Sequence, residues 1–114
     1  MKMRYCRNDF GLTDRKNLLK FIPVMKKTKR IKVFGEVQGV NFRAATQKEA
    51  RELGLGGYVK NMPDGSVLIE VSGDETKLER LAGWCRQGPP AADVTDIETS
   101  AATYREFSDF TIRY

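Results

Sequence analysis

The chain has 114 residues, with 20 Lys and Arg against 15 Asp and Glu, and a formal net charge of +5. This length suits one domain of modest size built around a single hydrophobic core. No apolar run approaches the roughly 20 residues that a membrane-spanning helix needs. The chain also contains no histidine, which excludes a Ser-His-Asp triad and removes the usual transition-metal ligand. We therefore expect no membrane insertion and no imidazole-dependent chemistry.

The positive charge is concentrated at the N-terminus. Residues 1–30 hold ten Lys and Arg against two Asp and Glu, a net of +8, and residues 31–114 hold ten against thirteen, a net of −3. Binding to nucleic acid or to an acidic membrane would have to depend on this basic segment, because such binding needs a basic surface. We expect residues 1–27 to be a flexible extension, residues 28–114 to form the domain, and nucleic acid not to be a partner.

The two cysteines, Cys6 and Cys85, are too few for a disulfide framework. Two unrelated thiols suit a reducing compartment, so we expect a cytoplasmic protein. Cys85 falls on an apolar helical stripe, where a thiol acts as a small hydrophobe. A nucleophilic cysteine would need a neighbouring base, and histidine is not available.

The first predicted elements are a strand followed by a helix. Residues 30–37 alternate apolar and polar side chains, the period of two that is typical of a strand. From Arg43 the pattern changes to the spacing of an amphipathic helix, and Gly54 is a suitable stop. The apolar positions of this helix are Phe42, Thr46, Ala50 and Leu53.

A hairpin comes next. Residues 56–61 and 66–73 are predicted strands, and the second alternates Val67, Ile69 and Val71. The Met-Pro-Asp-Gly segment between them favours a tight turn, because proline presets the first turn position and Asp-Gly suits the next ones.

A second helix and two strands complete the pattern. Ser72 or Asp74 is expected to cap the helix, and Gly-Pro-Pro at 88–90 ends it. Strands are predicted at 92–99 and 107–114, and the buried stripe of the helix is Leu78, Leu81, Ala82 and Cys85. The order βαββαβ with a closing strand predicts an α+β, ferredoxin-like fold in which an antiparallel sheet carries two helices on one face.

The junction between the first strand and the first helix, Val-Gln-Gly-Val-Asn-Phe-Arg at 37–43, has the features of an anion site. Unpaired main-chain N–H groups and the helix dipole favour an anion there. Gly39 allows the backbone to curl so that the N–H groups converge, and the Arg43 guanidinium can bind two phosphate oxygens at once. On these residues alone, an ordinary glycine-containing connection with a surface arginine explains the pattern equally well.

Two long motifs resemble the acylphosphatase family. VFGEVQGVNFR at 33–43 matches the first family signature, and GYVKNMPDGSVLIEVSG at 57–73 matches the second. RQGPP at 86–90 is similar to a stretch of prokaryotic relatives, and the resemblance covers residues 28–114.

The resemblance implies hydrolysis of acyl phosphates to a carboxylate and inorganic phosphate, without metal or cofactor. It implies that Arg43 and the loop amides bind the phosphate and that Asn61 positions a water molecule. Taken alone, Asn61 suits a turn cap better than a catalytic role. The loop implied by the resemblance consists of Gln38, Gly39, Val40, Asn41, Phe42 and Arg43, and Asn41 is expected to contribute its amide N–H rather than its side chain.

This chemistry does not need the missing histidine. The leaving group is a carboxylate, whose conjugate acid has a pKa near that of Asp or Glu, about 4, so it departs without a proton. Phosphoryl transfer depends mainly on positioning and electrostatic stabilisation. We therefore expect poor activity on ordinary phosphate esters, whose alkoxide leaving groups need an acid.

Besides binding through the basic N-terminal segment, one other alternative to an enzyme remains open. The same loop would serve a non-catalytic module that binds phosphate or carbamoyl phosphate for a partner, as in related domains of larger hydrogenase-maturation proteins. The absence of a second domain favours a free-standing enzyme, and we expect a monomer.

Overall fold

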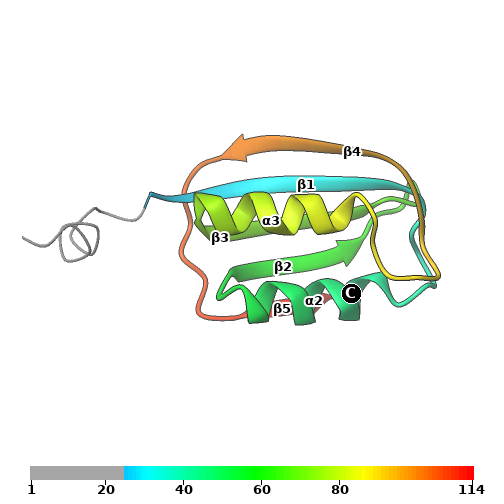
Figure 1. The fold of residues 1–114 in the computed structure, drawn as a ribbon, viewed down its shortest axis with the longest axis horizontal. Coiled ribbons are helices and arrows are strands. Elements are labelled where there is room, and N and C mark those ends of the chain that lie inside the picture. Colours follow the sequence, from blue (N-terminus) through cyan, green and yellow to red (C-terminus); the bar gives the residue numbers. More distant parts are fainter. Residues whose placement is uncertain (1–24) are drawn as a thin grey trace, which may run out of the picture.

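The structure of the protein is a computed structural model in which residues 25–114 are described. The elements run in the order β1, α2, β2, β3, α3, β4, β5 (Figure 1). Their bounds are β1 Lys26–Glu36, α2 Phe42–Glu52, β2 Gly56–Asn61, β3 Val67–Asp74, α3 Glu75–Cys85, β4 Asp93–Ala102 and β5 Phe110–Arg113. Strand β1 begins before the predicted residue 30. Residues 1–24 of the expected extension, Cys6 among them, lie outside the described residues.

The five strands form one sheet in the order β4-β1-β3-β2-β5. All neighbouring strands are antiparallel except β2 and β5, which pair in parallel. The prediction of an antiparallel sheet is confirmed for the other pairs, and β2 with β5 is the exception. The reason lies in the connection 103–109, which joins the two edge strands β4 and β5. It crosses the sheet at the end where β4 finishes, so β5 starts from that same end. Strand β5 must then run opposite to β4 and parallel to β2.

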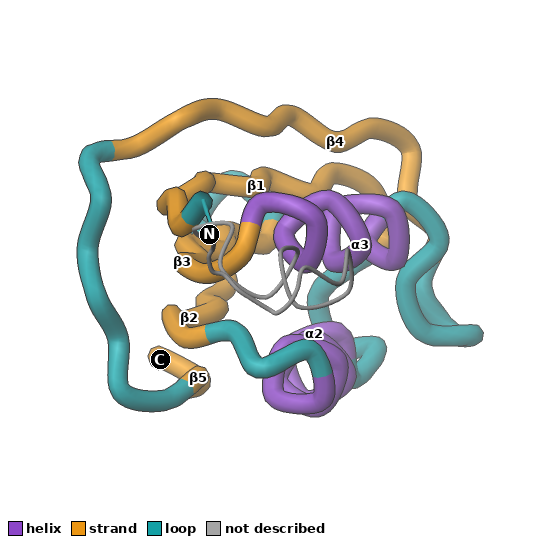
Figure 2. The backbone as a smooth tube through the Cα atoms, turned by 60° about the vertical axis from the view of Figure 1, so that its left-hand side comes forward, coloured by secondary structure: helices purple, strands orange, loops and turns teal. Residues whose placement is uncertain are grey.

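Both helices cover the same face of the sheet. Figure 2 shows α2 and α3 together on one side, with the strands on the other. Helix α3 packs on β1 and β3, and α2 packs on β2 and β5. The predicted ferredoxin-like α+β plan is confirmed by this arrangement.

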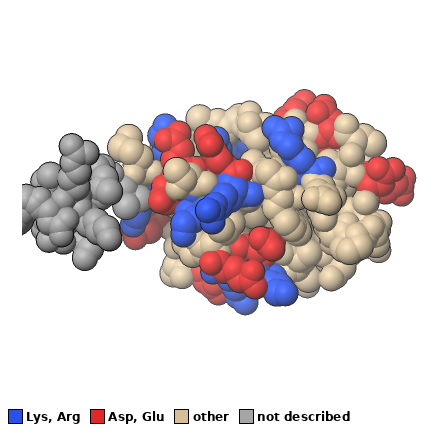
Figure 3. Space-filling model, viewed as in Figure 1, with Lys and Arg blue, Asp and Glu red and all other residues tan. Residues whose placement is uncertain are grey.

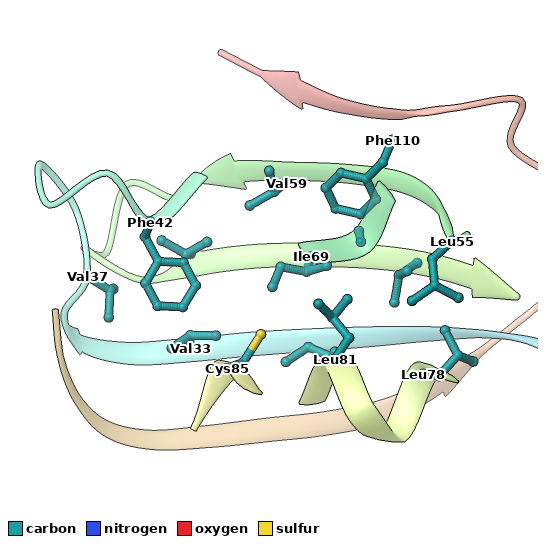
Figure 4. Close-up of a cluster of buried hydrophobic side chains, with 14 residues drawn as sticks. Val33, Val37, Phe42, Leu55, Val59, Ile69, Leu78, Leu81, Cys85 and Phe110 are labelled. Carbon is teal, nitrogen blue, oxygen red and sulfur yellow. The ribbon is translucent and has the colours of Figure 1, made fainter. Parts of the chain in front are cut away.

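The core lies between the sheet and the helices (Figure 4). Alternating strand residues such as Ile31, Val33 and Ile69 point into it and are fully buried. Leu78 and Leu81 of α3 pack against them from the helical side. The alternating pattern of the strands and the helical spacing in α3 both predict this burial. Cys85 also lies here, and burial together with the negative charge of Glu49 raises the pKa of its thiol to about 12. A thiol of this kind is a packing group, as expected from the sequence.

The helix-free face carries a buried carboxylate, Glu70, whose residue is 1% exposed. Arg30 Nε and Arg105 Nη1 donate to its two oxygens at 3.0 and 3.1 Å, and the Tyr58 hydroxyl donates at 3.3 Å. Arg105 belongs to the connection 103–109, and its amide N donates to Thr28 Oγ1 at 2.9 Å. These contacts attach the connection to the sheet and thereby help to hold β5 in place.

The ends of three strands meet on one side of the molecule. Asn61 pairs with Val67, and Val67 pairs with Val33, so all three lie in one row across the sheet. Lys60 pairs with Arg113, which places Tyr114 next to Asn61. The loop that leaves β1 toward α2 starts at this same end. In Figure 4, Val37 and Phe42 lie at the corresponding end of the core.

Candidate active site

A pocket of about 210 Å³ lies where these strand ends meet the first turn of α2. It is lined by Val37, Gly39, Asn41, Phe42, Arg43, Ala44, Asn61, Ile112 and Tyr114. The fold therefore brings Arg43 and Asn61, which are 18 positions apart in the sequence, to one cavity. Of the predicted loop, Gly39, Asn41, Phe42 and Arg43 line the pocket, whereas Gln38 and Val40 do not.

The backbone of the loop is curled. Gly39 has φ 75° and Asn41 has φ 67°, both in the left-handed region. Asparagine tolerates this conformation better than most residues, which explains its presence at the start of α2. Where left-handed residues alternate with right-handed ones, successive main-chain N–H groups point to one side and form a concave surface suited to an anion.

The N-terminus of α2 is open to a ligand. Its N-cap residue, Asn41, makes no side-chain capping hydrogen bond. Helix α3 differs, because its N-cap Asp74 accepts a hydrogen bond of 3.1 Å from the Thr76 amide. The orphan N–H groups of the first turn of α2, together with the helix dipole, therefore provide a positive partial charge at the pocket.

Arg43 lines this pocket. Its guanidinium carbon lies 4.7 Å from the centre of the Tyr114 ring. None of the ion pairs among residues 25–114 includes Arg43. An arginine that is stacked on an aromatic ring and not paired with a carboxylate keeps its planar donor fork for an incoming anion.

Phe42 anchors the loop to the core. Its residue is only 2% exposed, and its ring lies 5.6 Å from that of Trp84 in α3, centre to centre. A Cβ atom added at Gly88 would come within 2.8 Å of the Phe42 ring, so the glycine of the predicted RQGPP segment leaves room for Phe42. This packing fixes the first turn of α2 against the second helix.

Gln38 has a different position from the rest of the predicted loop. Its side-chain Nε2 donates hydrogen bonds of 2.8 Å to the main-chain oxygens of Met62 and Ser66. These residues flank the turn that follows Asn61. The side chain of Gln38 therefore joins the loop to that turn instead of facing the pocket.

The turn itself is held by Asp64. The hydroxyl and amide of Ser66 donate to Asp64 Oδ1, and Lys32 Nζ lies 3.0 Å from Oδ2. These contacts hold the pKa of the Asp64 carboxyl well below its usual range, and the hydrogen bond from the Ser66 hydroxyl has the largest effect. The carboxylate is at the surface and stabilises the turn that carries the Gln38 contacts.

Four pocket residues were not among the predicted site residues: Val37 and Ala44, which adjoin the predicted loop in the sequence, and Ile112 and Tyr114, which come from β5 and the residue after it. The alternation of Phe110, Ile112 and Tyr114 predicted a strand, but not its neighbour. Only the parallel pairing with β2 places the end of β5 beside Asn61. The alternation itself gives no signal for which strand is the neighbour.

Other features of the described residues do not converge on this site. A larger cavity, of about 400 Å³, lies at the opposite end of the sheet, where its lining includes Lys26, Leu55 and Phe107. Residues 25–114 contain no cluster of three His, Cys, Asp or Glu side chains that would suit a metal ion. No helix in this part of the chain has the length and apolar content to span a membrane. On the face in Figure 3, Lys and Arg are interspersed with Asp and Glu and form no single basic field.

Comparisons with known proteins agree with the fold. A sequence profile described as Acylphosphatase matches residues 29–112. An acylphosphatase of Anaeromyxobacter sp. (strain Fw109-5) is 48% identical over 85 residues, which is 74% of this chain and 91% of the relative. The crystal structure of acylphosphatase from Bacillus subtilis is similar with a TM-score of 0.75 at 38% identity, covering 79% of this chain and all of the other. Full-length HypF, in its phosphate- and nucleotide-bound form, gives 0.76 at 28% identity over 82% of this chain but only 12% of HypF.

The fold and the pocket define a ferredoxin-like α+β protein with a pocket between its first helix and the adjoining strand ends. A hydrolase is the class of protein that the relatives indicate. The chain belongs to the acylphosphatase family.

Proposed function

We propose that this chain hydrolyses acyl phosphates, with Arg43 and the amides of the 38–43 loop binding the phosphoryl group and Asn61 orienting the attacking water. The observation that carries the proposal is the shared pocket of about 210 Å³. Around it lie a helix N-terminus without a side-chain cap, the Asn61 amide, and an arginine that makes no ion pair within residues 25–114. The family membership supports the same reaction.

The phosphoryl group is the part of the substrate that the site recognises. Its oxygens accept hydrogen bonds from the first-turn N–H groups of α2 and from the curled loop at Gly39 and Asn41. The Arg43 guanidinium donates two parallel hydrogen bonds, a pairing that a planar fork makes well. These fixed donors need little reorganisation when negative charge moves onto the phosphoryl oxygens in the transition state.

Asn61 has the right chemistry to orient water. Its amide offers both a donor and an acceptor, but it is not a base near neutral pH. In the reaction, the water oxygen forms a bond to phosphorus while the bond from phosphorus to the acyl oxygen breaks. The water gives its proton to a phosphoryl oxygen, and the carboxylate leaves with the bonding electron pair. Because the carboxylate is a weak base, no acid side chain is required.

A direct test compares two substrates in excess chelator. Benzoyl phosphate is expected to release benzoate and inorganic phosphate, whereas phenyl phosphate, an ester, is expected to be hydrolysed very slowly. Comparable rates on the ester, or activity that chelator abolishes and Mg²⁺ restores, would contradict the proposal.

The similarity to a part of HypF is the observation that favours the alternative, a phosphate-binding module without turnover. The acylphosphatases of Anaeromyxobacter and Bacillus subtilis match along 91% and 100% of their own lengths, and they favour an enzyme. Binding of inorganic phosphate without hydrolysis of benzoyl phosphate would support the module instead.

A further inference from the structure

The pocket has two chemically different sides. One side is polar and consists of the loop backbone, Arg43 and Asn61. The other consists of Ala44, Ile112 and Tyr114. Ile112 is partly buried against the core, while Tyr114 is 97% exposed. A substrate whose phosphoryl group occupies the polar side must place its acyl group toward the second side.

Apart from Arg43, whose guanidinium lies against the Tyr114 ring, the described residues of the second side offer no positive charge to the acyl group. Among the described residues that line the pocket, Arg43 is the only one with a charged side chain. The nearest cation along β5, Arg113, lies on the opposite face of the sheet, where its guanidinium carbon is 3.9 Å from the centre of the Tyr58 ring. Once Arg43 binds the phosphoryl group, a second anionic group on the substrate finds no counter-charge in the pocket.

The size of the pocket limits how much of the substrate it encloses. Its volume of about 210 Å³ is below the range of roughly 300–1,000 Å³ that encloses drug-sized ligands. The phosphoryl group and the first atoms of the acyl group fill such a space. The remainder of a larger acyl group extends over the exposed Tyr114 ring, which is an open surface and sets no upper limit on size.

We propose that the acyl group lies against Ile112 and Tyr114, so that acyl phosphates with apolar, uncharged acyl groups are better substrates than those that carry a second anionic group. This inference rests on the hydrolysis proposed above. An aromatic or aliphatic acyl group gains apolar contact with Ile112 and Tyr114, whereas a free carboxylate loses part of its hydration there without an ionic partner.

The test measures kcat/KM of the full chain for benzoyl phosphate and succinyl phosphate, with acetyl phosphate as a small reference. The succinate dianion is a more basic leaving group than benzoate, and acetate lies between them in basicity. Acetyl phosphate therefore shows how much of any preference comes from the leaving group and how much from the acyl contacts. We expect benzoyl phosphate to be preferred over succinyl phosphate by about tenfold or more. Equal values, or a preference for succinyl phosphate, would overturn the inference. Failure to hydrolyse any of the three would count against the proposed function itself.

An engineered charge provides a second test. Ala44 is exposed in the first turn of α2 and lines the pocket, so Ala44→Lys supplies the missing cation. We expect it to raise the ratio of succinyl to benzoyl phosphate kcat/KM by roughly two- to fivefold, the effect of an exposed ion pair. The matched control is Gln87→Lys, an exposed residue that lines none of the cavities described, and it should leave the ratio unchanged. An unchanged ratio in Ala44→Lys, or an equal rise in the control, would contradict the proposed position of the acyl group.

Discussion

The side chain of Gln38 donates a hydrogen bond of 2.8 Å to the main-chain oxygen of Ser66, across 28 positions of the sequence. A second bond of the same length reaches the Met62 oxygen. The loop before α2 and the turn after Asn61 are thus joined directly. Gln38 therefore holds the loop at a fixed separation from the turn that follows Asn61, and we propose that it acts as a positioning residue.

Gln38→Ala should weaken catalysis more than phosphate binding. Without the two hydrogen bonds the loop and Asn61 lose their common support, and small misplacements of reacting groups cost up to about 100-fold in rate. We expect kcat on benzoyl phosphate to fall by roughly 10- to 100-fold, with a smaller change in the affinity for inorganic phosphate. Gln87→Ala removes an exposed glutamine elsewhere and serves as the control. Equal losses in kcat and affinity would indicate that Gln38 contacts the ligand instead.

Asn61→Ala should separate turnover from binding. Loss of one well-placed polar group in an active site costs on the order of 100- to 1,000-fold in kcat, because the water is no longer oriented. The affinity for inorganic phosphate, measured by calorimetry, should change little, since Arg43 and the loop remain. A parallel loss of phosphate affinity would place Asn61 among the phosphate-binding groups.

Tyr114→Ala should weaken phosphate binding moderately. The Tyr114 ring faces the Arg43 guanidinium at 4.7 Å, and an exposed cation–π contact contributes about 0.5–1 kcal/mol, or roughly two- to fivefold in affinity. Tyr114→Phe keeps the ring and should bind phosphate like the wild type. Tyr104→Ala, an exposed tyrosine at the opposite end of the sheet, is the control. A full effect of Tyr114→Phe would show that the hydroxyl matters and the ring does not.

The depressed pKa of Asp64 predicts that the free energy of unfolding depends on pH. Its pKa in the folded protein is depressed by Ser66 and Lys32, whereas an unfolded aspartate has a pKa of about 3.9. The ionised carboxylate therefore stabilises the fold above about pH 4, and this contribution is lost as pH falls toward the depressed folded value. Urea unfolding should show Asp64→Asn less stable than the wild type at pH 7, and the difference should shrink below pH 4. A difference that is constant with pH would rule out this titration.

The sequence predicted most of the fold because its patterns are local. The alternation of Val67, Ile69 and Val71 and the helical spacing of Leu78, Leu81 and Cys85 follow directly from which side chains are buried. The beginning of β1 was missed because Lys26 and Lys27 give no apolar alternation. The burial of Glu70 could not be predicted from local patterns, because its partners Arg30, Tyr58 and Arg105 come from distant parts of the chain.

The site was less predictable because it depends on tertiary pairing. Arg43 and the loop could be proposed from their own motif, and the second motif supplied Asn61. The direction of the Gln38 side chain depends on the turn at Met62 to Ser66, and no spacing rule predicts it. Tyr114 reaches the pocket because β5 is parallel to β2, a feature that the antiparallel prediction did not include.

The most direct test of the account is benzoyl phosphate turnover by Arg43 variants in the presence of chelator. A cationic clamp on a transferring phosphoryl group contributes on the order of 1,000-fold or more, so Arg43→Ala should have almost no activity. Arg43→Lys should not restore it, because a single ammonium cannot replace the planar fork. Arg80→Ala, which removes an exposed arginine of α3, controls for the change in net charge. Near-normal turnover by Arg43→Ala, in a variant that folds like the wild type, would contradict the central claim.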